Sequence, residues 1–202
     1  FLNNEFLTVK GDLKSNFELN KNDFRKYTNF EKNIFNDLFL KGNFINKFQI
    51  KFDETLKVKD YSLSIISDLN NSKATLSETF KNELLYEGID DVRLKNSKLE
   101  IQYNSNKNNY LKSSGLYSFN NLDFLDFNIE TFFKNKKKDI KIKGKFNQKI
   151  KLPIINYESL GNDTEIMANI SSDSNSLILK KISFKEKKNL INIENFSIKD
   201  NK

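Results

Sequence analysis

The sequence contains no histidine, no cysteine and no tryptophan, and only one proline and one methionine in 202 residues. Without histidine or cysteine the chain has no imidazole base, no thiolate nucleophile and no disulfide framework. Zinc and copper sites depend on the same side chains, so they are excluded as well. Only carboxylates remain for acid–base chemistry. We therefore expect no enzyme, no metal site and no cofactor.

Glycine and long apolar runs are scarce too. The six glycines are scattered, so no phosphate-binding loop is formed. No apolar run approaches the roughly 18 residues that a membrane-spanning helix needs. Residue 1 is Phe and no signal-like segment follows it. We expect an internal piece of a longer protein, with any membrane anchor outside the chain.

The residues that are abundant are lysine, asparagine and phenylalanine. Lys and Arg number 34 against 27 Asp and Glu, which gives a net charge of +7, and 37% of the residues are hydrophobic. This apolar share is low for a thick core. No shift in composition and no Pro- or Gly-rich linker divides the chain, so we expect one unit over 1–202.

The dominant pattern is an alternation of apolar and polar residues, which places the two kinds on opposite faces of a strand. It is clearest over 48–59 and 140–152, where lysines occupy most of the alternate positions. Weaker copies recur up to the C-terminal end, where a change of phase indicates a bulge. Polar junctions separate these segments. The pattern predicts a mainly all-β chain with an antiparallel strand array over 44–202.

Two stretches break the alternation. Residues 22–39 carry apolar side chains near helical spacing, with Asn22 or Asp23 as a possible cap and Gly42 beyond. Residues 77–87 show a shorter version, with Ser77 as the cap. We predict one or two short helices, which are too small to cover so many strands.

The acidic residues nearest to one another are Asp90 with Asp91, Asp123 with Asp126, and Asp163 with Glu165. A catalytic pair needs two carboxyls that face one pocket with separated pKa values. These pairs lie in polar junctions, where aspartate is a common turn residue. We interpret them as solvated turns.

Lysines crowd the segment 134–151 and alternate there with aromatic and aliphatic residues. A single-strand nucleic-acid site needs stacking aromatics and cations on one surface. Here the alternation puts Phe146 and Lys145 on opposite faces. We therefore expect a solvated lysine face that discourages aggregation, and no nucleic-acid partner.

The apolar face must be hidden from water by one of three arrangements. The sheet can pack on a second sheet as a sandwich, close into a barrel, or curl into a trough that holds an apolar ligand. Packing alone favours the sandwich. The low apolar content, the Phe-rich face and the few helices favour the trough.

The segments 92–103 and 182–198, each a strand, a short charged turn and a second strand, resemble the repeating β-groove units of the AsmA/TamB-like envelope proteins. The resemblance implies a long curled antiparallel sheet with an open apolar groove. It further implies a non-enzymatic protein that carries phospholipid or other acyl-chain lipids between the inner and outer membranes. Such a protein is periplasmic and tethered to the inner membrane of a Gram-negative bacterium.

Two functional hypotheses follow. In the first, the chain is a lipid conduit and acyl chains lie against one apolar face, lined by Phe48, Ile50, Phe52, Leu56, Val58, Leu125, Phe127, Ile129, Ile140, Ile142, Phe146, Ile150 and Leu152. In the second, the chain is an interaction or adhesin-like β-sandwich, and the same residues form its dry core.

Overall fold

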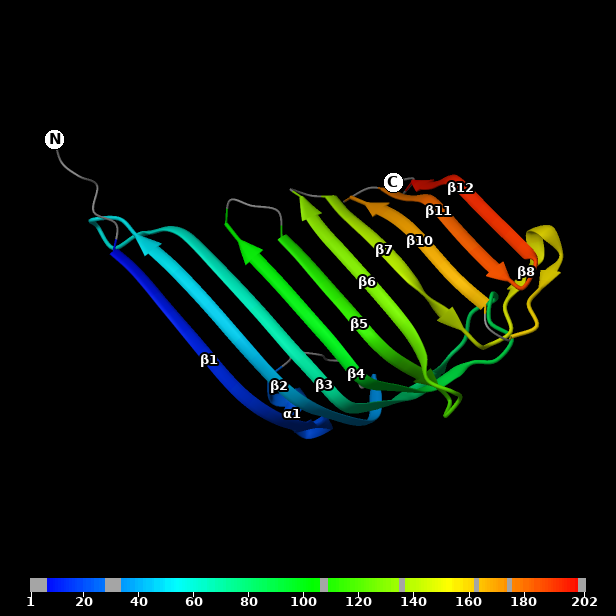
Figure 1. Ribbon diagram of the computed structural model, residues 1–202, viewed down its shortest axis with the longest axis horizontal. Coiled ribbons are helices and arrows are strands. Elements are labelled where there is room, and N and C mark those ends of the chain that lie inside the picture. Colours follow the sequence, from blue (N-terminus) through cyan, green and yellow to red (C-terminus); the bar gives the residue numbers. More distant parts are fainter. Residues whose placement is uncertain are drawn as a thin grey trace.

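The computed structural model describes residues 7–27, 34–105, 109–134, 137–161, 164–173 and 176–199. Ten strands form one antiparallel sheet in which each strand pairs with the next one along the chain, except that β7 pairs with β10 (Figure 1). The order is β1-β2-β3-β4-β5-β6-β7-β10-β11-β12, and β8 and β9 form a separate pair. The mainly all-β class, the antiparallel array and its curl agree with the sequence-based prediction.

The strands of the large sheet are long, and few residues lie in helices. The elements are β1 (Leu7–Asn20), α1 (Lys21–Tyr27), β2 (Phe35–Phe52), β3 (Val58–Phe80), β4 (Ile89–Asn104), β5 (Asn109–Phe119), β6 (Leu125–Lys134), β7 (Lys137–Phe146), β8 (Lys151–Leu152), η1 (Pro153–Ile155), β9 (Tyr157–Glu158), β10 (Thr164–Ser172), β11 (Ser176–Glu186) and β12 (Asn189–Lys199).

The alternation along each strand gives the sheet one apolar and one polar face. A single register row crosses nine strands on the apolar face, and seven of its members are apolar: Phe44, Ser67, Leu99, Ser113, Ile129, Ile142, Ala168, Ile182 and Ile193. The lysines of β7 at positions 141, 143 and 145 lie on the other face, as the alternation predicts.

Bulges keep the apolar residues on one face where the sequence changes phase. The register of β10 with β11 shifts between Asn169 and Ile170, where Lys180 is the extra residue of β11. In β12, Asn195 lies at the same level, between the partners of Lys181 and Leu179, and has a φ of 58°. The bulge expected near the C-terminal end is therefore confirmed. A second bulge lies at Asn96 in β4, whose φ is 49°. Asparagine tolerates this left-handed conformation better than most residues do.

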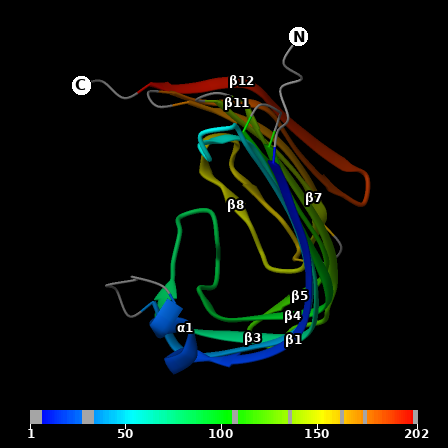
Figure 2. The same cartoon turned by 90° about the vertical axis from the view of Figure 1, so that its left-hand side faces the viewer.

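The sheet is strongly curved, and the apolar face is the concave one. Figure 2 shows the β7–β10 connection, with β8 in it, on the inner side of the curve. Glu186 of β11 lies on the same face of its strand as Phe184, and it accepts hydrogen bonds from Tyr157 and Leu160 of that connection. The connection therefore packs on the face that carries the apolar side chains.

The helix expected over 22–39 is present only at its start. Helix α1 covers Lys21–Tyr27, residues 28–33 lie outside the described residues, and 35–39 belong to β2. Asn20, rather than Asn22 or Asp23, caps the helix, since its Oδ1 accepts the amides of both residues at 2.8 and 3.1 Å. Pairing of β2 with β1 and β3 satisfies backbone groups along a whole strand, which outweighs a weak helical preference.

The helix expected over 77–87 is wrong. Residues 77–80 end β3, and Ser77 donates its amide to the Ile34 carbonyl at 2.8 Å. The following residues form an irregular connection in which Leu85 pairs with Ile150. An isolated helix of this length is marginal in water, so long-range pairing decides the structure.

Three strand boundaries also differ from the prediction. The array begins at Leu7 rather than at 44, because β1 and the first half of β2 are strands too. The alternating segment 48–59 is interrupted by a turn at 53–57, where Asp53 accepts hydrogen bonds from the amides of Thr55 and Lys57. The second segment, 140–152, leaves the large sheet after Phe146.

The two-layer sandwich is not what the described residues form. They make one ten-stranded sheet and one two-stranded sheet, and strands β1 and β12 stay at opposite edges. Few apolar side chains are fully buried in this part of the chain: Leu38, Ile89, Ile150, Leu152 and Ala168. Most of the concave apolar face is only half-buried.

Gly115 of β5 is a position where a side chain should not fit. Its φ is +150°, and an added Cβ would lie 2.5 Å from the Cα of Ser97 on β4. We expect Gly115→Ala to lower the free energy of unfolding by about 1–3 kcal/mol, because the two strands must separate locally. Urea unfolding measures this change. The exposed neighbour Ser114→Ala should stay within about 0.5 kcal/mol of the wild type, and an equal loss in both variants would contradict the steric explanation.

Candidate apolar binding site

The concave face is hollowed where β4 to β7 and β10 lie side by side. The hollow has a volume of about 320 Å³ and is lined almost wholly by apolar atoms. Its lining residues are Val92, Leu94, Tyr117, Phe119, Phe127, Ile129, Ile142, Lys143, Gly144, Lys145, Phe146 and Ile166. Gly144 faces the hollow without a side chain, and this deepens the hollow between Phe127 and Ile166.

Aromatic rings form the floor of this hollow. The Tyr117 ring lies 4.8 Å from the Phe119 ring and 6.0 Å from the Phe127 ring, and Phe119 is 6.3 Å from Phe146. The Tyr117 hydroxyl donates to the Lys145 carbonyl oxygen, so it does not present a free donor to a ligand. The floor is therefore apolar in character even at its tyrosine.

Burial, together with the nearby Asp126 carboxylate, raises the pKa of Tyr117 to about 12. The phenol therefore stays neutral in alkaline solution. Because this pKa lies above that of an exposed tyrosine, the stability it contributes is complete below about pH 10 and is lost as the pH rises through 12. Absorbance at 295 nm should show a phenol that titrates near 12, and Tyr117→Phe should remove that step. If a titration step near pH 12 survives the substitution, that step belongs to another tyrosine.

A small covering element lies over the concave face next to the hollow. This cover consists of residues 84–86, 149–152 and 157–159. The amide of Tyr86 donates to the Lys149 carbonyl at 3.1 Å, and the amide of Lys151 donates to the Leu84 carbonyl at 2.9 Å. Strand β8 pairs in turn with β9. Segments that are distant in sequence are thus hydrogen-bonded to one another in the cover.

The two faces of the cover differ in chemistry. Ile150 and Leu152, only 5% and 7% exposed, lie on its inner face. Lys149 and Lys151 lie on its outer face, with their ammonium groups 5.6 and 4.4 Å from the centre of the Tyr86 ring. The inner face therefore packs against the large sheet, and the lysines point to solvent.

Glu186 fixes the cover to the large sheet. Its carboxylate is 2% exposed and accepts the Leu160 amide at 2.8 Å and the Tyr157 hydroxyl at 3.0 Å. The Thr164 hydroxyl donates to the same carboxylate at 3.3 Å. A buried carboxylate needs such donors in place of water. This network ties β9 and the start of β10 to the end of β11.

Ten of the thirteen residues expected to line a groove lie on the concave face: Phe48, Ile50, Phe52, Val58, Leu125, Phe127, Ile129, Ile140, Ile142 and Phe146. Four of them, Phe127, Ile129, Ile142 and Phe146, line the hollow itself. Leu56 lies instead in the 53–57 turn and is 68% exposed. Ile150 and Leu152 are buried in the cover because the chain leaves β7 after Phe146.

The alternation pattern does not single out Tyr117 and Phe119 as lining residues. The alternating set of β5 runs through Ser113 and Gly115 before it reaches them, so its apolar pattern is short. Val92, Leu94 and Ile166 lie in segments that the sequence predicts as strands, but they are not among the thirteen residues expected to line the groove. Their place in the hollow depends on the bulge near Asn96, since this bulge reverses the phase of β4.

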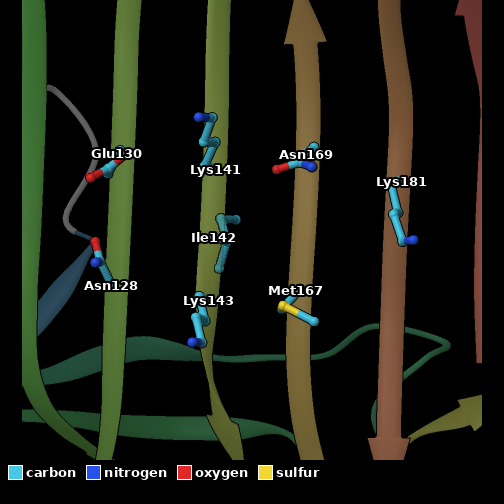
Figure 3. Close-up of a pocket in the computed structure, with 8 residues that line it drawn as sticks. All are labelled: Asn128, Glu130, Lys141, Ile142, Lys143, Met167, Asn169 and Lys181. Carbon is cyan, nitrogen blue, oxygen red and sulfur yellow. The ribbon is translucent and has the colours of Figure 1, made fainter. Parts of the chain in front are cut away.

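The convex face carries a second hollow of about 290 Å³, bordered mostly by polar and charged residues (Figure 3). It spans four adjacent strands and is lined by Asn128, Glu130, Lys141, Ile142, Lys143, Met167, Asn169 and Lys181. Lys181 forms an ion pair with Glu194 at 3.2 Å, and Glu130 lies opposite Lys141 in the register. Mixed, solvated charges of this kind agree with the interpretation of the lysine ladder as a water-facing surface.

The acidic pairs do not converge on a pocket in the described part of the chain. Asp90 accepts the Thr79 hydroxyl and Asp91 lies 3.9 Å from the Arg93 side chain, which are structural contacts. Asp163 lies outside the described residues. Within those residues no cluster of three or more acidic side chains could hold a metal ion, and no helix has the length and hydropathy to cross a membrane.

Comparisons of the chain with protein-family models, with curated proteins and with solved structures give no match. The concave face is therefore the feature of this chain from which a function can be inferred.

Proposed function

We propose that the protein is a non-enzymatic lipid-binding protein whose concave face holds acyl chains. One observation carries the proposal. An extended apolar face, with a hollow at its centre, is left mostly uncovered by the rest of the described chain. Large exposed apolar patches on a folded protein usually mark a binding surface.

The physical basis is non-directional burial. The groups that the ten strands use for pairing are already hydrogen-bonded within the sheet, so the face offers apolar contact rather than polar recognition. Each methylene buried against such a face contributes about 0.8 kcal/mol. A chain of a dozen methylenes therefore has enough surface to bind even if only part of it is covered.

The finer proposal is a conduit for phospholipid between the inner and outer membranes, as in the AsmA/TamB-like proteins that the sequence resembles. A sheet built in chain order and open along one side supports it, because lipid tails can move along an open trough. In this proposal the chain works in the periplasm of a Gram-negative bacterium and is held at the inner membrane by a segment outside the sequence.

Mass spectrometry of small molecules extracted from the purified chain tests the proposal. The chain should be expressed in a bacterial envelope, with an unrelated periplasmic β-protein purified alongside it. We expect phospholipid or another acyl-chain lipid to co-purify well above the level of that control. A monomeric, lipid-free protein with a cooperative melt would contradict the proposal and favour an interaction domain.

A further inference from the structure

Strand β1 forms a long free edge of the large sheet. It pairs with β2 from Leu7 to Asn20 without a register shift, and no other strand of the described chain pairs with it (Figure 1). The strand contains no proline, and Leu7, Val9 and Leu13 are 53%, 42% and 53% exposed. Proteins usually keep such an edge short or interrupt it, because its unpaired backbone groups can bind a further strand.

The odd-numbered residues of β1 continue the concave apolar face. A Cβ added to Gly11 would lie 2.4 Å from the Phe48 ring, so this ring covers Gly11. The Phe17 ring lies 6.1 Å from the ring of Phe44, which belongs to the apolar row of the sheet. A strand that paired with β1 would therefore extend the trough.

The even-numbered residues of β1 place three charges on the convex face, in the order Lys10, Asp12 and Lys14. Lys47 lies opposite Asp12 on β2, yet none of the three forms an ion pair among the described residues. Charged side chains on an edge usually keep other strands away. These charges alternate in sign, so they match an antiparallel copy of the same strand.

Only one register of two β1 strands joins nearly their full length with opposite charges in contact. Opposite residues in an antiparallel ladder lie on the same face, so odd-numbered residues must face odd-numbered ones. A pair centred on Leu13 sets Asp12 of each copy against Lys14 of the other. Pairs centred on Asp12 or on Lys14 bring like charges together instead, which is unfavourable.

We propose that β1 is a dimerisation edge, on which β1 of a second copy pairs antiparallel about Leu13. The ladder runs from Leu7 to Leu19 in both copies and ends before α1 begins. It supplies about a dozen backbone hydrogen bonds. On the concave face, Leu7 then faces Leu19 and Val9 faces Phe17. Two ten-stranded sheets form one continuous trough, and the inference does not rest on lipid binding.

The opposite edge of the sheet, β12, is less suited to pairing. Asn195 lies in the middle of this strand with a φ of 58°, and this left-handed residue interrupts the extended backbone that a new ladder needs. Pairing of β1 with β12 of another copy would also repeat without closing and produce fibres. Pairing of β1 with itself is two-fold symmetric, so we expect a closed dimer.

The mass of the 202-residue chain in solution gives the first test. Size-exclusion chromatography with light scattering should give twice the 23.7 kDa of one copy at about 100 µM, and a mass that falls toward one copy on dilution. A monomer at this concentration would overturn the inference, and so would a mass that keeps growing beyond two copies. Lipid is not measured, so a failure of the proposed function leaves this result unchanged.

Exchange of the two central charges gives the second test. Asp12→Lys and Lys14→Asp each set two like-charged pairs together, so we expect each to raise the dissociation constant of the dimer about tenfold. The double variant restores opposite charges and should restore the wild-type constant. Lys145→Asp, exposed on β7 and distant from this edge, is the control and should not change it. A double variant as weak as the single ones would overturn the register.

Hydrogen exchange locates the contact. In an isolated chain, alternate amides of β1 point away from β2 and exchange quickly. We expect these amides to be protected at the concentration at which the dimer forms, and to exchange quickly again in the Lys14→Asp variant. A dimer whose β1 amides exchange as fast as in the monomer would place the contact elsewhere and would overturn the inference.

Discussion

Phe127→Asp is expected to abolish the retention of acyl lipid while the ten-stranded sheet still forms. Phe127 lies on the concave face of β6, half-buried, with its ring against Tyr117 in the floor of the hollow. A carboxylate at this position is hydrated as long as no acyl chain covers it. An acyl chain that bound there would bury an unpaired charge, which is very costly. The open face lets the new charge hydrate in the lipid-free protein. Ile142→Asp, on the neighbouring strand, should act in the same way.

Lipid content by mass spectrometry and far-ultraviolet circular dichroism together check this expectation. Asn128→Asp is the matched control, because it adds the same charge one residue away on the exposed convex face of β6. The control should keep its lipid. If the Phe127→Asp protein retains its lipid, the concave face is not the binding site. Loss of the circular dichroism signal in this variant would instead indicate that Phe127 belongs to a dry core.

Glu186→Ala is expected to detach the cover and to destabilise the protein by about 2–4 kcal/mol. The substitution leaves the Leu160 amide and the hydroxyls of Tyr157 and Thr164 without their acceptor in a buried position. Each unsatisfied buried donor costs about 1–3 kcal/mol, reduced where water can enter. Hydrogen exchange should therefore rise in 149–160, with little change in the strands distant from the cover.

Glu165→Ala serves as the control for this prediction. Glu165 is exposed on β10 and pairs loosely with Lys185 at 3.8 Å, so its loss should change stability by less than about 1 kcal/mol. If both variants lose the same stability, or if exchange in the cover stays at the wild-type level, Glu186 is not its anchor.

The strands that could be predicted best from the sequence are those in which apolar and polar residues alternate without a break. Segment 140–146 alternates apolar residues with lysine, and it forms most of β7 with that pattern. The pattern failed at 53–57, because Leu56 and Val58 keep the even spacing of the apolar residues beyond Glu54. What ends the strand is the Asp53 carboxylate, which accepts the amides of Thr55 and Lys57. The hydrogen bond from the Thr55 hydroxyl, together with these two bonds from amides, lowers the pKa of Asp53 to about 2.

The site could be predicted only in part, for a different reason. Alternation identifies a face, such as that of Phe127 and Ile142, but not which residues of that face stand side by side. That depends on strand register, and here the bulges near Asn96 and Lys180 set the register. The cover depends on the pairing of Leu85 with Ile150, 65 positions apart by their numbers. Local patterns carry no information on such a contact.

The pairing of strands in chain order has a consequence for how the sheet can fold and change in length. All pairs in the large sheet except β7 with β10 join consecutive strands, so each hairpin closes a short loop at a small entropic cost. Such a sheet behaves like a one-dimensional array, in which stability is the sum of nearest-neighbour contacts. Fraying should begin at β1 and β12, each of which has a single neighbour. A hairpin can then be added to or removed from an edge of the sheet without repacking the middle strands. Each such change alters the length of the trough by two strands.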